Sequence, residues 1–118
     1  MVVRMNELEK PGPKVIFLGD PFIDYYPNKQ IFSGRIKNIG QIRADFVRVI
    51  GNLFDQTTEN TGTDSIFVKG TRIAYDSNVV ADTALEPGQT ASYTLTVSIT
   101  KGKKAQYHTM DIHWDQTR

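Results

Sequence analysis

The sequence predicts an all-β protein, a β-sandwich of about seven to eight antiparallel strands. Three observations lead to this prediction. Residues 90–100, TASYTLTVSIT, alternate without a break between apolar and polar side chains, as a strand with one buried face does. Several other short apolar runs are separated by Gly and Pro turn signals. No window has the 3.6-residue periodicity of an amphipathic helix.

Composition limits the function classes that the chain fits. Its 118 residues suit one domain, and 14 basic against 13 acidic residues give a formal net charge of +1. This balance provides no general attraction to nucleic acid or to an anionic membrane. There is no cysteine, which excludes disulfides, thiolate nucleophiles and Cys-based zinc sites. The apolar runs, such as residues 15–18, are too short to insert into a bilayer.

Proline residues divide the first part of the chain into short segments. Residues 1–13 are polar and end in Pro-Gly-Pro, so we expect a disordered or frayed lead-in before a single domain over 14–118. Residues 14–18, KVIFL, form a short apolar run typical of a strand. Residues 20–30 hold aromatic side chains between two prolines, which indicates an edge strand or an extended crossing.

Residues 31–38, IFSGRIKN, also alternate, with Phe32, Gly34 and Ile36 on one side. An inward-facing glycine makes room for a bulky side chain, which we expect to come from the facing sheet. The following Asn38 and Gly40 tolerate positive φ, so we expect them to turn the chain toward the next strand.

The middle of the chain reads as a long strand, a loop and another strand. Residues 43–55 form the long strand, and the polar residues 55–65 are predicted to form a loop. Residues 66–75 are strand-like, with Gly70 suggesting a bulge inside the strand.

The C-terminal third holds the clearest patterns. Pro87 and Gly88 fit the central positions of a type II turn. In the strand after it, the alternation predicts one set of side chains in the core, namely Ala91, Tyr93, Leu95, Val97 and Ile99. Residues 101–104, KGKK, read as a tight hairpin turn that returns into a last strand over 105–114.

Two stretches carry a family resemblance. FSGRIKNIGQIRADFVRVIGNLFDQ, followed by LEPGQTASYTLTVS, resembles the FxLYD domain, an immunoglobulin-like module of bacterial and archaeal cell-envelope proteins, and is more loosely similar to the CARDB domains. The naming motif falls on residues 51–55. Leu53 and Asp55 match it, Phe54 replaces the tyrosine, and Gly51 replaces the phenylalanine. The resemblance covers about residues 30–100, and its motifs are structural.

The resemblance implies an immunoglobulin-like sandwich that acts as an interaction or spacer module without enzymatic activity and without a cofactor. It also implies an extracytoplasmic location, in the cell envelope or secreted, with a leader peptide outside these residues. The expected partners are other domains of a longer polypeptide or a separate protein. From the residues themselves, the chain has no Gly-x-Ser-x-Gly elbow and no phosphate-binding Gly-rich loop, which also argues against an enzyme.

The long strand predicts a candidate interaction face because it is apolar on both sides. Val47, Val49 and Leu53 share one parity, and the other parity carries Phe46, Arg48, Ile50 and Phe54. Only one side of a strand faces the core of a sandwich, so the second set needs a cover. The cover is either the chain itself, through residues 20–26 or a bulge at Gly51 that switches parity, or a partner surface, including a second copy in a weak homodimer.

The alternative function is a small-ligand or metal-binding sandwich that uses acidic and aromatic loops. The acidic residues that a calcium ion would use are Asp20, Asp24, Asp55, Glu59, Asp64, Asp76 and Asp82. They lack the spacing of a dedicated calcium loop, and Asp is also a common turn former. The aromatic candidates for a ligand platform are Phe22, Tyr25 and Tyr26, although aromatic residues beside proline at a sheet edge more often cover the core.

Copper is the other metal considered. His108 and Met110 share a strand face and could offer soft ligands to Cu(I), whereas His113 falls on the opposite face. Such a site needs further methionines, and only Met1 and Met5 remain. A plain strand face is therefore the preferred interpretation of this pair.

Overall fold

The computed structural model describes residues 11–76 and 78–116, and these residues contain nine strands and no helix. The all-β prediction is confirmed. The strands are β1 (Val15–Phe17), β2 (Phe22–Tyr26), β3 (Lys29–Asn38), β4 (Ala44–Phe54), β5 (Asn60–Phe67), β6 (Thr71–Ala74), β7 (Val80–Ala84), β8 (Thr90–Ser98) and β9 (Tyr107–Gln116).

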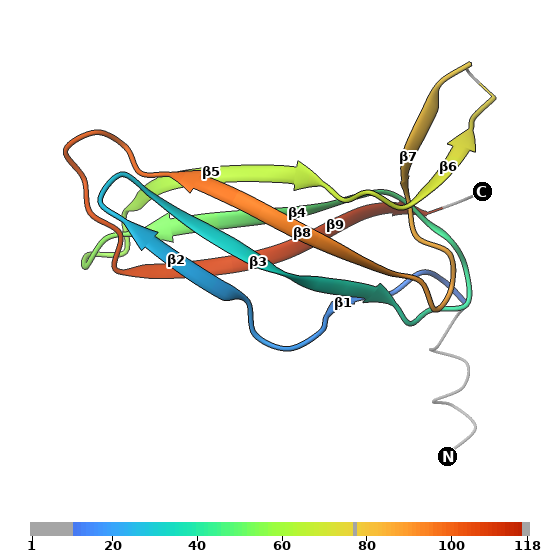
Figure 1. Ribbon diagram of the computed structural model, residues 1–118, viewed down its shortest axis with the longest axis horizontal. Coiled ribbons are helices and arrows are strands. Elements are labelled where there is room, and N and C mark those ends of the chain that lie inside the picture. Colours follow the sequence, from blue (N-terminus) through green and yellow to red (C-terminus); the bar gives the residue numbers. More distant parts are fainter. Residues whose placement is uncertain (1–10, 77, 117–118) are drawn as a thin grey trace, which may run out of the picture.

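The strands form two antiparallel layers and a separate hairpin (Figure 1). In sheet A, β3 is central: β8 pairs along one edge, while β2 and β1 pair with the first and second halves of the other edge. In sheet B, β4 lies between β5 and β9. Strands β6 and β7 pair with each other and project from one end of the molecule.

The core lies between the two sheets and follows the predicted alternation. On β8, Ala91, Tyr93, Leu95 and Val97 are buried, while the Ser and Thr residues between them are exposed. Ile99 follows the end of the strand and is only partly buried. Full burial of one such aliphatic side chain contributes about 1.5–3 kcal/mol to folding, so these residues are a main source of stability.

Gly34 faces the core as predicted, but the side chain that uses the space comes from the neighbouring strand of the same sheet. Gly34 pairs with Tyr93 of β8, and a Cβ on Gly34 would lie 2.8 Å from the Tyr93 hydroxyl. The Tyr93 ring meets the ring of Phe17 edge-on, with 5.9 Å between centroids. Tyr93 therefore crosses over β3 at the glycine, and the expectation of a residue from the facing sheet was wrong.

Asn38 does not act as a positive-φ turn residue, and neither does Gly40. The Asn38 side chain is fully buried; its Oδ1 accepts hydrogen bonds from the backbone N–H groups of Lys14 and Gly40. Its Nδ2 donates to the carbonyl oxygens of Ile42 and Leu85. Asn38 therefore ties together three chain segments at one end of the sandwich, since a buried amide is stable only when its polar atoms are paired.

The predicted lead-in has two parts. Residues 1–10 lie outside the described residues. Residues 11–13 are attached to the domain, because the Gly12 carbonyl accepts a hydrogen bond from the Gln41 N–H at 3.1 Å. Gly40 lies against this segment, and a Cβ there would overlap the Gly12 carbonyl oxygen, which explains the glycine.

The region predicted as a loop followed by one strand is arranged differently. Strand β5 begins at Asn60, inside the predicted loop, and ends at Phe67. Its one fully buried side chain is Thr61, so its polar sequence gives no apolar alternation. Residues 66–75 are not one bulged strand, because β6 begins only at Thr71 and pairs with β7.

Two predicted turns have different outcomes. The type II turn is confirmed: Gly88 has φ +84°, and the Gln89 N–H donates to the Glu86 carbonyl. The Thr100–Lys103 segment also forms a turn, with Gly102 at φ +80°. However, β8 belongs to sheet A and β9 to sheet B, so this turn lies in a crossing between sheets and the hairpin prediction was wrong.

Candidate functional site

The two faces of β4 separate as its parity predicts. Val47, Val49 and Leu53 point into the core and are fully buried. Phe46, Arg48, Ile50 and Phe54 are partly exposed, and the last three share one parity on the outer face of sheet B. The predicted interaction set therefore does lie away from the core of the domain.

Neither predicted form of self-cover exists. Gly51 keeps regular pairing with both neighbouring strands, and the register of β4 shifts elsewhere, at Leu53/Phe54 against β5 and between Asp45 and Arg48 against β9. The aromatic segment 22–26 is strand β2 of sheet A. Both hypotheses of cover by the chain were therefore wrong.

The strand register sorts the outer face into rows across β5, β4 and β9. These rows are Phe67–Arg48–His113, Ser65–Ile50–Asp111, Thr63–Asn52–Thr109 and Asn60–Phe54–Tyr107. The third row is polar and hydrogen-bonded, with Asn52 accepting from Thr63 at 2.8 Å and donating to Thr109 at 3.3 Å. This row separates Phe54 from the rest of the predicted set.

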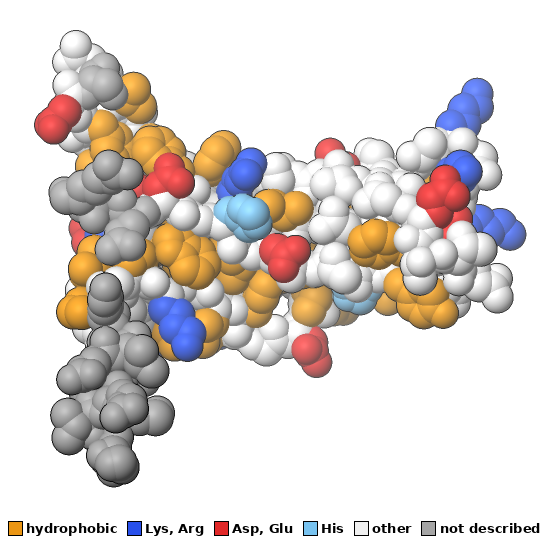
Figure 2. Space-filling model, turned by 180° about the vertical axis from the view of Figure 1, so that it is seen from behind, with side chains coloured by type: hydrophobic (Ala, Val, Ile, Leu, Met, Phe, Trp, Pro, Cys, Tyr) orange, Lys and Arg blue, Asp and Glu red, His pale blue; other side chains and the backbone are white. Residues whose placement is uncertain are grey.

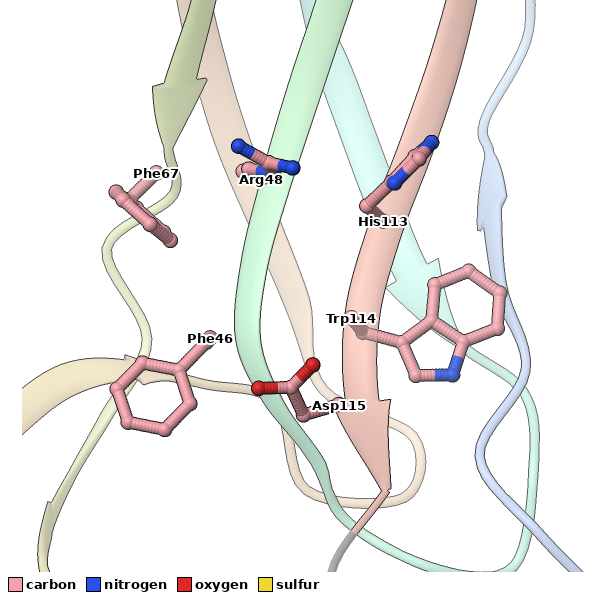
Figure 3. A pocket seen from close by; sticks show the side chains of 6 residues that line it. All are labelled: Phe46, Arg48, Phe67, His113, Trp114 and Asp115. Atoms are coloured by element: carbon pink, nitrogen blue, oxygen red, sulfur yellow. The ribbon is translucent and has the colours of Figure 1, made fainter.

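Apolar groups gather at the end of sheet B near the β6–β7 hairpin, and Figure 2 shows this end of the face as more hydrophobic than its largely polar middle. A pocket of about 410 Å³ opens here; Phe46, Arg48, Phe67, His113, Trp114 and Asp115 line it. In Figure 3 Phe46 and Phe67 lie on one side of Arg48, whereas Trp114 points to the far side of β9.

Phe46 owes its position to a β-bulge. It has φ +50°, which is rare for a residue with a side chain, and it lies where the β4–β9 register shifts. Its ring stacks on Tyr75, which follows β6, with 4.9 Å between centroids and 23° between planes. The hairpin thus covers part of one end of the outer face.

A charged cluster holds Tyr75 in place. Asp45 accepts hydrogen bonds from Arg43 Nε at 2.7 Å and from the Tyr75 hydroxyl at 3.0 Å. Burial and, after it, the hydrogen bond to Asp45 raise the pKa of Tyr75 to about 12. The same carboxylate raises the pKa of Arg43 through their hydrogen bond. Sequence reasoning missed this cluster, because nothing in the pattern connects Tyr75 with Asp45.

Arg48 is the cation of the pocket. Its guanidinium forms no hydrogen bond or ion pair with any other residue that the structure describes. Across the strands it lies between Phe67, which is 54% exposed, and His113. An arginine with free donors beside aromatic rings is suited to bind a carboxylate of another molecule. Phe67 and His113 lie beside Arg48 because of the register in which β4 pairs with β5 and β9. The sequence alone does not give this register.

Two of the acidic residues considered for calcium have structural roles: Asp55 stabilises its own loop, and Asp64 links β5 to β8. Asp55 accepts hydrogen bonds from Thr57 and from the Glu59 N–H, and the Thr57 side chain above all lowers the pKa of Asp55. Asp64 accepts a hydrogen bond from the Ser98 N–H at 2.9 Å. Among the described residues no three His, Asp or Glu side chains form a group that could hold a metal ion.

The histidines lie on opposite faces of β9, as predicted. His108 packs its ring against Phe32, with 5.1 Å between centroids, and Met110 packs partly buried against the core. His113 lies on the outer face beside Arg48. The further methionines considered for copper, residues 1 and 5, lie outside the described residues.

The aromatic residues of β2 do not share one platform. Phe22, Tyr25 and Tyr26 are all exposed, but the register places Tyr25 on the opposite face of sheet A from the other two. The Tyr26 ring has the Lys29 ammonium 5.3 Å from its centroid.

Comparison of the chain with family models, with curated proteins and with solved structures found no match in any of the three. None of the described residues forms a helix of the length and hydropathy needed to cross a membrane. The geometry of the outer face is therefore the main guide to function.

Proposed function

We propose that the chain is a non-enzymatic, immunoglobulin-like protein-binding module that contacts its partner through the hairpin end of sheet B's outer face. One observation carries the proposal: Arg48 presents a cation that has no partner among the described residues, between the exposed Phe67 ring and His113 and beside a pocket of about 410 Å³. Arginine and aromatic residues are the types most enriched at the energetic centres of protein interfaces.

Strand pairing supports the immunoglobulin-like arrangement. In such domains strand B pairs with A and E, while strand C pairs with F and, in the variable type, with C′. Here β3 pairs with β1 and β8, and β4 pairs with β5 and β9. The correspondence assigns β3 and β4 to strands B and C, and it makes the β6–β7 hairpin an addition between C′ and E.

Arg48 and Phe67 favour an acidic, partly apolar segment of a protein as the partner, although Asp115 also lines the pocket. Its volume is at the small end of those that hold a drug-sized molecule, and it suits one or two side chains. A carboxylate of the partner would bind Arg48, and an apolar side chain would pack on Phe67. From the family resemblance we propose that such contacts occur in the cell envelope, with another domain of a longer polypeptide or with a separate protein.

Site-specific photo-crosslinking in extracts of the source cells tests the proposal. A crosslinking amino acid at position 67 should capture a protein, and Arg48→Glu in the same chain should abolish the capture by reversing the charge. The same crosslinker at Thr94, exposed on the outer face of sheet A, is the matched control. Capture of the same protein from both positions, or capture that survives Arg48→Glu, would contradict the proposal.

A further inference from the structure

The strand β9 presents a long free edge. It pairs with β4 on one side, and no other strand of the described residues lies along its other side. The corresponding edge of sheet A is broken into β1 and β2 and flanked by Pro21 and Pro27, two features that prevent strand addition. The ten residues of β9 contain no proline, so their outward N–H and C=O groups form a template for another strand.

Apolar side chains beside this edge are incompletely covered. Met110, Ile112 and Trp114 point from β9 toward the core, yet each remains partly exposed. Their counterparts at the other side of the sandwich, Leu95 and Val97 of β8, are 2% and 0% exposed. A strand added to β9 would bury more apolar surface, which addition to β8 would not.

The side chains of β9 indicate which strand fits its free edge, because two antiparallel copies of β9 place complementary side chains opposite each other. When two copies run antiparallel with Ile112 opposite its own equivalent, Asp111 lies opposite His113 of the partner subunit, and the reverse pair forms by symmetry. In the same register Met110 lies opposite Trp114 of the partner subunit. An imidazole N–H can donate a hydrogen bond to a carboxylate across the ladder, and a methionine packs well on an indole ring.

The neighbouring registers of the β9–β9 pairing are less favourable. A shift by two residues in one direction places Asp111 opposite its own equivalent, and a shift by two in the other places it opposite Asp115 of the partner subunit. Both bring like charges together, which destabilises a cross-strand pair. We propose that two copies of this chain pair through β9 in the Ile112-centred register and join their two sheets B into one continuous sheet. This pairing uses the edge of sheet B, and it shares His113 with the outer-face site proposed above.

Analytical ultracentrifugation of the whole chain with a charge exchange tests the pairing. The wild type should sediment as a dimer as its concentration rises toward about 1 mM. His113→Asp places a carboxylate opposite Asp111 in this register and should raise the dimer Kd by about tenfold or more. Adding Asp111→Lys supplies an ammonium group opposite the introduced carboxylate and should restore the wild-type Kd. Asp76→Lys, on an exposed residue of the β6–β7 hairpin, is the matched control and should change nothing.

Three results would overturn the inference: a monomer at every concentration, a dimer that His113→Asp leaves unchanged, or a double variant that does not recover. If the variants fail to fold, amide exchange of the wild type decides. Alternate amides of β9 should exchange slowly at high concentration and fast at low concentration, and exchange independent of concentration would contradict the pairing. Phe67 lies on β5, which β4 separates from β9, so Phe67→Ala should weaken the proposed partner site and leave dimerisation intact. A failure here is therefore distinguishable from a failure of the proposed partner site.

Discussion

The two long sides of the sandwich differ in how they are closed. On one side β5 and β8 approach each other: the Ser98 N–H donates to Asp64, and the Thr100 N–H donates to the Thr61 carbonyl at 2.7 Å. On the other side, described residues provide no such link between β9 and the broken β1/β2 edge. The first side is sealed by backbone contact, while the second remains open.

The difference shows that the burial of a side chain depends on the strands beside it more than on its residue type. Leu95 and Ile112 are comparable aliphatic residues on edge strands that face the same core, yet only Leu95 is fully buried. The close approach on the sealed side depends on Gly62, where a Cβ would overlap the Ser98 carbonyl oxygen. A small residue thus closes one side, whereas on the other side β9 has no neighbouring strand among the described residues.

The largest expected effect comes from removing a core side chain on the sealed side, compared with the same change on the open side. Leu95→Ala should lower the free energy of unfolding by about 3–4 kcal/mol, because it leaves a cavity among packed residues. Ile112→Ala should cost about 1–2 kcal/mol, because part of that side chain already contacts water. Urea denaturation of both variants measures the difference. Equal losses would mean that the two sides are equally closed.

A smaller effect is expected at the glycine of the sealed side. Gly62→Ala should destabilise the domain by about 2 kcal/mol, because the added methyl group must push β5 away from β8. Ser65→Ala, at an exposed position of the same strand, should stay within about 0.5 kcal/mol of the wild type. Thermal unfolding compares the two, and a stable Gly62→Ala variant would show that the strands do not depend on this contact.

The smallest effect concerns Tyr75, which covers one end of sheet B independently of either side. Its pKa is raised from the usual 10.0 to about 12, so the folded state holds the phenolic proton more tightly than the unfolded state. The stabilisation is therefore complete below about pH 10 and is lost as the pH rises through about 12. Tyr75→Phe should make stability fall less steeply above about pH 10. An unchanged pH profile in denaturant titrations would contradict the Asp45–Tyr75 contact.

The sequence predicted those parts of the fold that depend on local pattern. The period-two alternation placed the β8 core residues correctly, and Pro87-Gly88 located its turn, because both signals lie within a few consecutive residues. Strand β5 was missed because its pairing depends on backbone hydrogen bonds to β4, and its polar residues up to Ser65 show no alternation. The sequence of the turn at Gly102 does not distinguish a hairpin from a crossing between sheets, although its flanking strands belong to different sheets.

The candidate site was predicted only along one strand. Parity alone identified Phe46, Arg48 and Ile50 as outward, but the added members Phe67 and His113 come from strands whose register is a tertiary property. The bulge that gives Phe46 its positive φ also has no local sequence signal. A single sequence therefore defines which face is free, and the neighbouring strands define what that face contains.

Fluorescence of Trp114 tests the central claim, that the β9 side is open and accepts a second copy. The chain has one tryptophan, so its emission reports this partly buried inner-face residue of β9 without interference. Acrylamide should quench Trp114 readily in dilute solution, at about 1 μM, and much less near about 1 mM, where the emission should also shift to the blue. Quenching and emission that stay the same across this range, whether shielded or exposed throughout, would contradict the account.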